Sequence, residues 1–137
     1  DIPLNVTSIA FNASFERNVI KRLAEKFPDL SEHLKNIEDH IVDLAIPFMK
    51  GYYYDIKQGG SNSIKYVMPA LCPSMEDAYH NLPFVHNGGE AMSEFPRMME
   101  APKDEEYKKK RQGMLDYCAL DTKSMVEVLN VLWKAIK

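Results

Sequence analysis

The sequence predicts a helix-rich α/β protein, and three observations support this prediction. Residues 4–11 mix β-branched and aromatic side chains with Thr and Ser, which is typical of a short strand. Several later stretches place apolar side chains three and four residues apart, the spacing of a helix that faces a core. The length of 137 residues and the 45% hydrophobic share suit one globular domain over residues 1–137.

The predicted strand leads directly into the first predicted helix. Asn12 or Ser14 is the expected N-cap, and Pro28 is expected to end the helix. Ser31 is expected to cap a second helix that runs to about His40. The core-facing side of the first helix is formed by Val19, Ile20, Leu23, Ala24 and Phe27.

The middle of the chain is less regular. The pattern of residues 41–46 fits a strand or a buried helix, and periodicity does not decide between them. Residues 52–62 are expected to form a loop. A helix of about two turns is predicted over residues 63–71, with its apolar face formed by Ile64, Val67, Met68 and Leu71.

The C-terminal half is predicted to be almost entirely helical. The Asn-Gly-Gly sequence at residues 87–89 predicts a sharp turn ahead of a helix at residues 90–99. Pro102 and Asp104 open the final helical stretch, which is expected to break or bend near Leu120 and then run to Ile136.

The single clear strand has a structural consequence. Because a lone strand cannot satisfy its own backbone, it is expected to pair with a missing part of the protein, or with a second copy in a homo-oligomer. The chain begins at Asp1 rather than Met and enters an apolar segment at once, which indicates a piece of a longer protein.

Composition limits the classes of function. No window approaches the roughly 18 uninterrupted apolar residues of a membrane span, so no membrane partner is expected. Cys72 and Cys118 form no disulfide framework and are expected to be buried free thiols in a reducing, cytoplasmic location. The net charge of −3 argues against a basic nucleic-acid-binding surface, although metal ions can hold phosphates in an acidic protein.

Asp121 is the most informative candidate site residue. It interrupts an apolar stripe at helical spacing, where an ionised carboxylate is costly unless a cation or metal pairs with it. Two structural alternatives remain open: a helix break that turns Asp121 outward, or a capping role for Asp121 ahead of Ser124. Tyr117 lies one turn earlier and can reach the same side. The other members of the stripe are Met114, Cys118, Met125, Val128 and Leu132.

Other polar residues are weaker candidates. Glu16 falls in the first turn of a helix that follows a strand, where it faces a ligand or simply favours the helix dipole, and Asn12 fits a cap. Asp43 and Glu90 are each more typical of a cap or a surface acid than of a functional carboxylate. The basic cluster Lys108–Arg111 suits a nucleic-acid backbone or, following acidic residues, a solvated helix face.

Two segments carry a resemblance to a known enzyme family. Asn12-x-x-Phe15-Glu16 and Tyr117-x-x-x-Asp121 resemble the second and third motifs of the DEDDy subgroup of 3'–5' exonucleases, in the DnaQ-like branch of the ribonuclease H-like superfamily. The chain is also similar over nearly its whole length to a bacterial domain family of unknown function. The segments that carry this second similarity are residues 12–16, 63–65, 87–91 and 117–121.

The resemblance implies a fold and a set of roles. The chain is expected to be the C-terminal portion of a ribonuclease H-like fold, with most of the central sheet missing. Carboxylates of such enzymes bind two Mg²⁺ or Mn²⁺ ions. Asp121 and Glu16 are the implied metal ligands, Tyr117 orients the attacking water, and Asn12 and Phe15 lie beside the substrate.

Two departures from the family pattern bear on activity. Glu16 stands where the second motif normally has Asp, which moves the carboxylate by about one bond length. The first motif, Asp-x-Glu on the opening strand, has no counterpart before Asn12. The sequence therefore predicts an inactive fragment of a metal-dependent exonuclease that acts on the 3' end of single-stranded DNA or RNA, or alternatively a non-catalytic helical interaction module.

Overall fold

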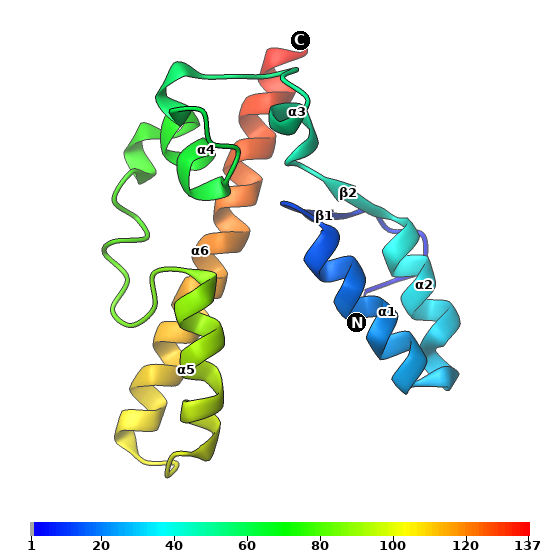
Figure 1. The fold of residues 1–137 in the computed structure, drawn as a ribbon, viewed down its shortest axis with the longest axis vertical. Coiled ribbons are helices and arrows are strands. Elements are labelled where there is room, and N and C mark those ends of the chain that lie inside the picture. Colours follow the sequence, from blue (N-terminus) through cyan, green and yellow to red (C-terminus); the bar gives the residue numbers. More distant parts are fainter. Residues whose placement is uncertain (1) are drawn as a thin grey trace.

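The computed structural model describes residues 2–137 and confirms a helix-rich α/β fold (Figure 1). Short 3₁₀ turns lie at Pro28–Leu30, Ile56–Gln58 and Pro73–Met75. The main elements are β1 (Ser8–Ala10), α1 (Ser14–Lys26), α2 (Ser31–Asp39), β2 (Ile41–Asp43), α3 (Ile46–Met49), α4 (Ile64–Leu71), α5 (Gly88–Glu100) and α6 (Glu105–Ala135).

The expectation that the first strand lacks a partner within the chain is wrong. β1 pairs in parallel with β2, and Ile9 lies opposite Val42 in the register. The ambiguous stretch at residues 41–46 is therefore a strand that ends at Asp43, after which α3 begins at Ile46. Parallel pairing requires a long crossover, which α1 and α2 supply.

The two faces of this small sheet are covered differently. α1 and α2 lie side by side next to the sheet (Figure 1), and Ala10, Ala13 and Ile41 form a buried cluster with Ile20 of α1. Alternation along the strands sends Ile9 and Val42 to the opposite face, where both are exposed. An apolar sheet face of this kind is normally covered in parallel α/β proteins.

The start of α1 departs from the expected capping. Ala13 is the N-cap residue, and Ser14 is already helical, so neither Asn12 nor Ser14 caps the helix with its side chain. Ser31 is likewise the first residue of α2, after Leu30 at the N-cap. Pro28 follows the end of α1 as predicted.

The helices of the C-terminal half follow local sequence signals more closely. The side chain of Asn87 accepts a hydrogen bond from the Glu90 backbone at 2.9 Å, and Asp104 accepts one from Tyr107 at the same distance. Gly88 and Gly89 are already part of α5, so the expected turn is shorter than predicted.

The predicted break near Leu120 does not occur. α6 runs without interruption from Glu105 to Ala135, a length of 31 residues. The segment around residue 120 contains neither Gly nor Pro, and the hydroxyl of Thr122 bonds back to the Cys118 carbonyl at 3.0 Å within the helix. The absence of a breaking residue is therefore sufficient to explain the continuous helix.

The main core gathers around α4 and the C-terminal half of α6. Phe48, Val67, Met68, Tyr79 and Val128 form its buried centre. The partly buried side chains that pack against this centre are Phe11, Tyr53, Ile64, Leu71, Cys72, Met75, Ala78, Leu82, Tyr117, Leu120 and Leu132.

A close contact joins the loop before α5 to α6. Gly113 is buried, and a Cβ atom placed on it lies 2.4 Å from the Cβ atom of Phe84. Only a residue without a side chain allows the loop to cross α6 at this distance. The N-terminal half of α6 then pairs with α5 to form a hairpin that extends away from the sheet (Figure 1).

The cysteines and the membrane prediction also have outcomes. Cys72 and Cys118 are both free thiols, as expected, but neither is buried: Cys72 is half-buried and Cys118 is exposed. Within residues 2–137, none of the helices combines the length and the apolar character required to cross a bilayer.

Candidate functional site

Asp121 lies on the side of α6 that faces the core, and its carboxylate is half-buried. The hydroxyl of Tyr79 donates a hydrogen bond of 2.7 Å to Asp121 Oδ1 and lies 3.3 Å from the hydroxyl oxygen of Ser124. Tyr79 is only 7% exposed and Ser124 is fully buried. The Tyr79 hydroxyl thus provides a hydrogen-bond donor for the Asp121 carboxylate. Asp121 is neither turned outward by a helix break nor placed as a helix cap, because it lies within the continuous helix α6.

Tyr117 lies beside this network, as its position one turn before Asp121 predicts. Its ring centroid is 6.3 Å from that of Tyr79, at an interplanar angle of 57°. Burial and the neighbouring Asp121 carboxylate raise the pKa of Tyr117. Burial also raises the pKa of Tyr79, although its hydrogen bond with Ser124 opposes the shift. Both phenols therefore keep their protons at neutral pH and can donate hydrogen bonds.

The predicted apolar stripe on α6 matches the structure only in part. The buried positions on this helix are Gly113, Ser124 and Val128, of which the stripe includes Val128 alone. Met114 and Met125 are half-buried, and Cys118 is exposed. Small residues thus occupy the deepest part of the interface, where they allow other elements to approach α6 closely.

The second motif forms the junction between β1 and α1. Glu16 is exposed in the first turn of α1, and the Phe15 side chain is 59% exposed. Asn12 adopts a left-handed backbone conformation with φ of 63°, and its side-chain oxygen accepts a hydrogen bond from Ser14 Oγ at 3.2 Å. The junction therefore presents an amide, an aromatic ring and a carboxylate on the surface.

Asp43 fixes the shape of this junction. Its Oδ1 atom accepts hydrogen bonds from the backbone N–H groups of Asn12 at 2.8 Å and Ala45 at 2.9 Å, and Oδ2 accepts one from Ala13 at 3.0 Å. Asp43 thus binds backbone N–H groups at the start of α1, about 30 residues away, and at the start of α3. These groups belong to residues at or before the N-caps Ala13 and Ala45, so Asp43 joins the two segments without capping either helix.

Glu90 has a capping role. Its Oε2 atom accepts hydrogen bonds from the His86 backbone at 2.8 Å and from His86 Nδ1 at 3.0 Å, and Oε1 accepts one from the Asn87 side chain. The hydrogen bond from the His86 backbone is the main reason that the pKa of Glu90 is lowered. These contacts complete a reciprocal cap at the start of α5.

The basic cluster at Lys108–Arg111 is partly neutralised within its own helix. Lys108 pairs with Glu105, and Lys110 pairs with Glu106 at 2.9 Å, which raises the pKa of Lys110. These pairs support the solvated-face alternative over a nucleic-acid-binding role for Lys108 and Lys110.

Several predicted segments meet around the main core. Phe11, at the end of the β1 segment, packs against the same buried cluster as Tyr117 and Leu120 of α6. Phe11 and Asn12 also line a pocket with Asn62, Ser63 and Ile64 at the start of α4. The structure thus brings the second-motif segment and the α4 segment together, and it joins both to α6 through shared packing.

The carboxylates do not form a metal cluster on their own. Among residues 2–137, no three His, Cys, Asp or Glu side chains lie close enough together to hold a metal ion. Oxygen ligands from Glu16 and Asp121 suit Mg²⁺ or Mn²⁺ chemically, but these two residues alone supply only part of a two-ion site.

The sequence did not indicate the roles of Tyr79, which donates a hydrogen bond to Asp121, and of Ser124, which lies within hydrogen-bonding distance of Tyr79. Tyr79 is 42 residues from Asp121, and no local pattern marks it. Ser124 lies one helical turn after Asp121, so a small polar residue on the buried side of α6 was the available signal.

Comparison with known proteins gives a limited result. A model of the family described as "Domain of unknown function (DUF2779)" matches residues 1–63. This similarity covers β1 to the start of α4 and includes Asn12, Glu16 and Asp43, but it does not extend to Tyr117 and Asp121. Searches of curated proteins and of solved structures found no match.

Proposed function

We propose that this chain carries the second and third motifs of a DEDDy-type 3'–5' exonuclease domain, within a parent protein that cleaves nucleic-acid phosphodiesters. The main supporting observation is the shared core. Phe11, next to the second motif, and Tyr117, in the third, pack on one buried cluster although about 100 residues separate them. The parallel β1–α1–α2–β2 unit is also the kind of unit from which α/β sheets are built.

The proposed roles follow from the resemblance and the chemistry of each side chain. Asp121 and Glu16 supply carboxylate oxygens to the metal site, and the protonated hydroxyl of Tyr117 orients the attacking water. Asn12 and Phe15, both exposed at the β1–α1 junction, contact the substrate strand. Two Mg²⁺ or Mn²⁺ ions, when bound, stabilise negative charge at the scissile phosphate.

The missing partner of this site is the segment with the first motif, in the same domain of the parent protein. Its strands are suited to cover the exposed apolar face of Ile9 and Val42 and to pair with the free edge of the sheet. The chain alone is expected to bind metal weakly and to leave single-stranded DNA and RNA intact. A cytoplasmic location belongs to the same proposal.

A second candidate function is a non-catalytic helical interaction module that retains a degenerate nuclease fold. One observation favours it: the Asp121 carboxylate already receives a short hydrogen bond from the buried Tyr79 hydroxyl, so the fold satisfies this charge without a metal. The presence of Glu16, where the family pattern has Asp, agrees with this alternative.

The deciding experiment measures release of 3'-labelled nucleotide from single-stranded DNA and RNA by the full-length parent, with Mn²⁺ and with a chelator. Asp121→Asn is expected to abolish metal-dependent release while folding is preserved. Asp116→Asn is the matched control, because Asp116 lies on the same helix outside the Asp121 network and accepts a hydrogen bond from Gln112 at 2.8 Å. An active Asp121→Asn enzyme contradicts the proposed roles, and a folded, inactive wild type supports the interaction module.

A further inference from the structure

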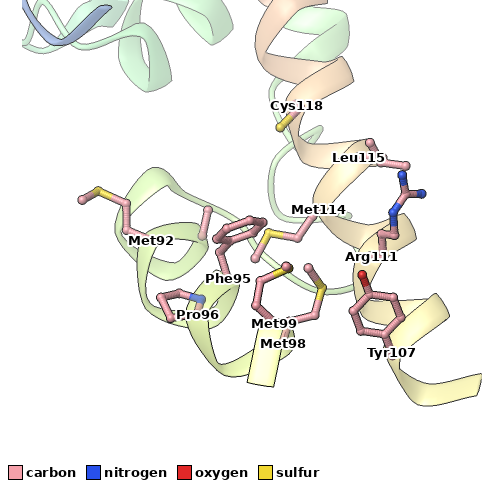
Figure 2. A pocket seen from close by; sticks show the side chains of 11 residues that line it. Met92, Phe95, Pro96, Met98, Met99, Tyr107, Arg111, Met114, Leu115 and Cys118 are labelled. Carbon is pink, nitrogen blue, oxygen red and sulfur yellow. The ribbon is translucent and has the colours of Figure 1, made fainter. Parts of the chain in front are cut away.

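The α5–α6 hairpin carries an open apolar groove that the proposed exonuclease chemistry does not use. The groove has a volume of about 600 Å³ and runs between the two helices. Figure 2 shows Phe95, Met98 and Met99 of α5 gathered opposite Met114 of α6. Most of the surface that lines the groove belongs to apolar side chains.

These side chains are exposed to an unusual degree for their type. Met92 is 68% exposed, Phe95 is 53% exposed and Met99 is 50% exposed. Exposed apolar surface of this kind marks an interaction site in a soluble protein, and methionine adapts its shape to different partners. The three residues recur at three- and four-residue spacing along α5, which forms a continuous ridge.

The shape of the groove suits a third helix. Two antiparallel helices that pack at one edge leave a channel, and an amphipathic helix fills such a channel with residues at positions i, i+3 or i+4, and i+7. An extended strand is less suitable, because a groove between two helices offers no sheet edge with which a strand can pair.

The charge of the groove indicates the kind of helix that binds. Arg111 is the only charged side chain that lines it, and it forms no ion pair within residues 2–137. The neighbouring cations are already used: Arg97 pairs with Glu94 at 2.7 Å, and Lys103 donates a hydrogen bond to the Met99 carbonyl at 3.0 Å. The groove therefore presents one unpaired positive charge beside an apolar floor.

We propose that the α5–α6 groove binds an amphipathic helix of a partner protein, with apolar side chains against Phe95 and the methionines and a carboxylate against Arg111. A single-stranded nucleic acid is disfavoured, because one free cation supplies little of the phosphate binding that such ligands require. A second copy of this chain is the competing occupant, and the test below distinguishes it through a concentration-dependent dimer.

The test uses the full chain and two synthetic amphipathic peptides of about 18 residues, long enough for five helical turns. Both peptides carry Leu at helical spacing, and they differ only in having Glu or Lys at the position that meets Arg111. Fluorescence anisotropy is expected to show that the Glu peptide binds about three- to fivefold more tightly at low salt, with a smaller preference at high salt.

Substitutions in the groove separate the apolar and the charged contributions. Phe95→Asp is expected to abolish binding of both peptides, whereas Arg111→Glu is expected to reverse the preference toward the Lys peptide. Lys109→Glu is the matched control, because Lys109 is exposed on the same helix and does not line the groove. Circular dichroism confirms that each variant remains folded.

Three results overturn the proposal. Equal binding of the two peptides contradicts the role of Arg111, and no binding of either peptide contradicts the role of the groove. A concentration-dependent dimer that Phe95→Asp dissociates assigns the groove to a second copy. Binding of a single-stranded oligonucleotide that Arg111→Glu abolishes assigns it to nucleic acid. None of these results depends on whether the parent cleaves nucleic acid.

Discussion

Replacing Gly113 with Ala tests the packing between the loop at Phe84 and α6. Glycine in the interior of a helix normally costs about 0.5–1 kcal/mol relative to alanine, so a Gly→Ala change usually stabilises a protein. At Gly113 the added Cβ atom lies 2.4 Å from Phe84 Cβ and 3.3 Å from its Cγ atom. Overpacking of this kind costs about 1–3 kcal/mol, which exceeds the gain.

The expected net effect of Gly113→Ala is a loss of about 1 kcal/mol in the free energy of unfolding. With an m-value of about 2 kcal/mol/M, the urea midpoint falls by about 0.5 M. Far-ultraviolet circular dichroism during urea titration measures this shift. Phe84→Ala is not a rescuing substitution, because alanine keeps the Cβ atom that collides.

Gly88→Ala serves as the matched control for this prediction. Its added Cβ atom makes only an ordinary contact, 3.6 Å from the Tyr117 hydroxyl oxygen, and Gly88 is also helical. Gly88→Ala is therefore expected to leave the urea midpoint unchanged or slightly higher. A Gly113→Ala variant that is as stable as the wild type, or more stable, refutes the argument that loop and helix are in fixed contact here.

Three further predictions concern the polar network. Asp43→Ala is expected to lower the free energy of unfolding by roughly 2–3 kcal/mol in urea titration, because the buried N–H group of Ala13 loses its acceptor; an unchanged midpoint contradicts this. Folding raises the pKa values of Tyr79 and Tyr117, so their contribution to the free energy of unfolding is complete below pH 10.0, the pKa of an unfolded tyrosine, and is lost as the pH rises further. The urea midpoint of the double variant Tyr79→Phe/Tyr117→Phe should therefore fall less at alkaline pH than that of the wild type. Folding lowers the pKa of Glu90 below its ordinary value of 4.5, so its contribution to the free energy of unfolding is present above pH 4.5 and is lost in acid; the urea midpoint of Glu90→Gln should therefore fall less between neutral and acidic pH than that of the wild type.

The sequence was sufficient to predict those structural roles that depend only on neighbouring residues. The helix starts near Asn87 and Asp104 and the helix at α4 could be predicted, because each depends on contacts within about one helical turn. The hydrogen bonds from Asn12 and Ala13 to Asp43 could not be predicted, because Asp43 lies at the end of the other strand and only the parallel pairing brings it there.

The side of α6 that faces the core shows a second limit of sequence patterns. The expected stripe includes the buried Val128, but it misses Gly113 and Ser124, which are also buried and which hydrophobic patterns do not mark. Asp121 was expected to pair with a cation or metal, whereas its partner among the described residues is the Tyr79 hydroxyl, which a loop path that periodicity does not encode brings there.

The continuity of α6 has a mechanical consequence. At 1.5 Å per residue, its 31 residues form a rod of about 46 Å that carries the hairpin groove at one end and the main core at the other. Cys118, at the edge of the groove, directly follows Tyr117 in the Asp121 network. A partner seated in the proposed groove would therefore contact the same helix only one residue from Tyr117, so the groove and the Asp121 network meet on one continuous element.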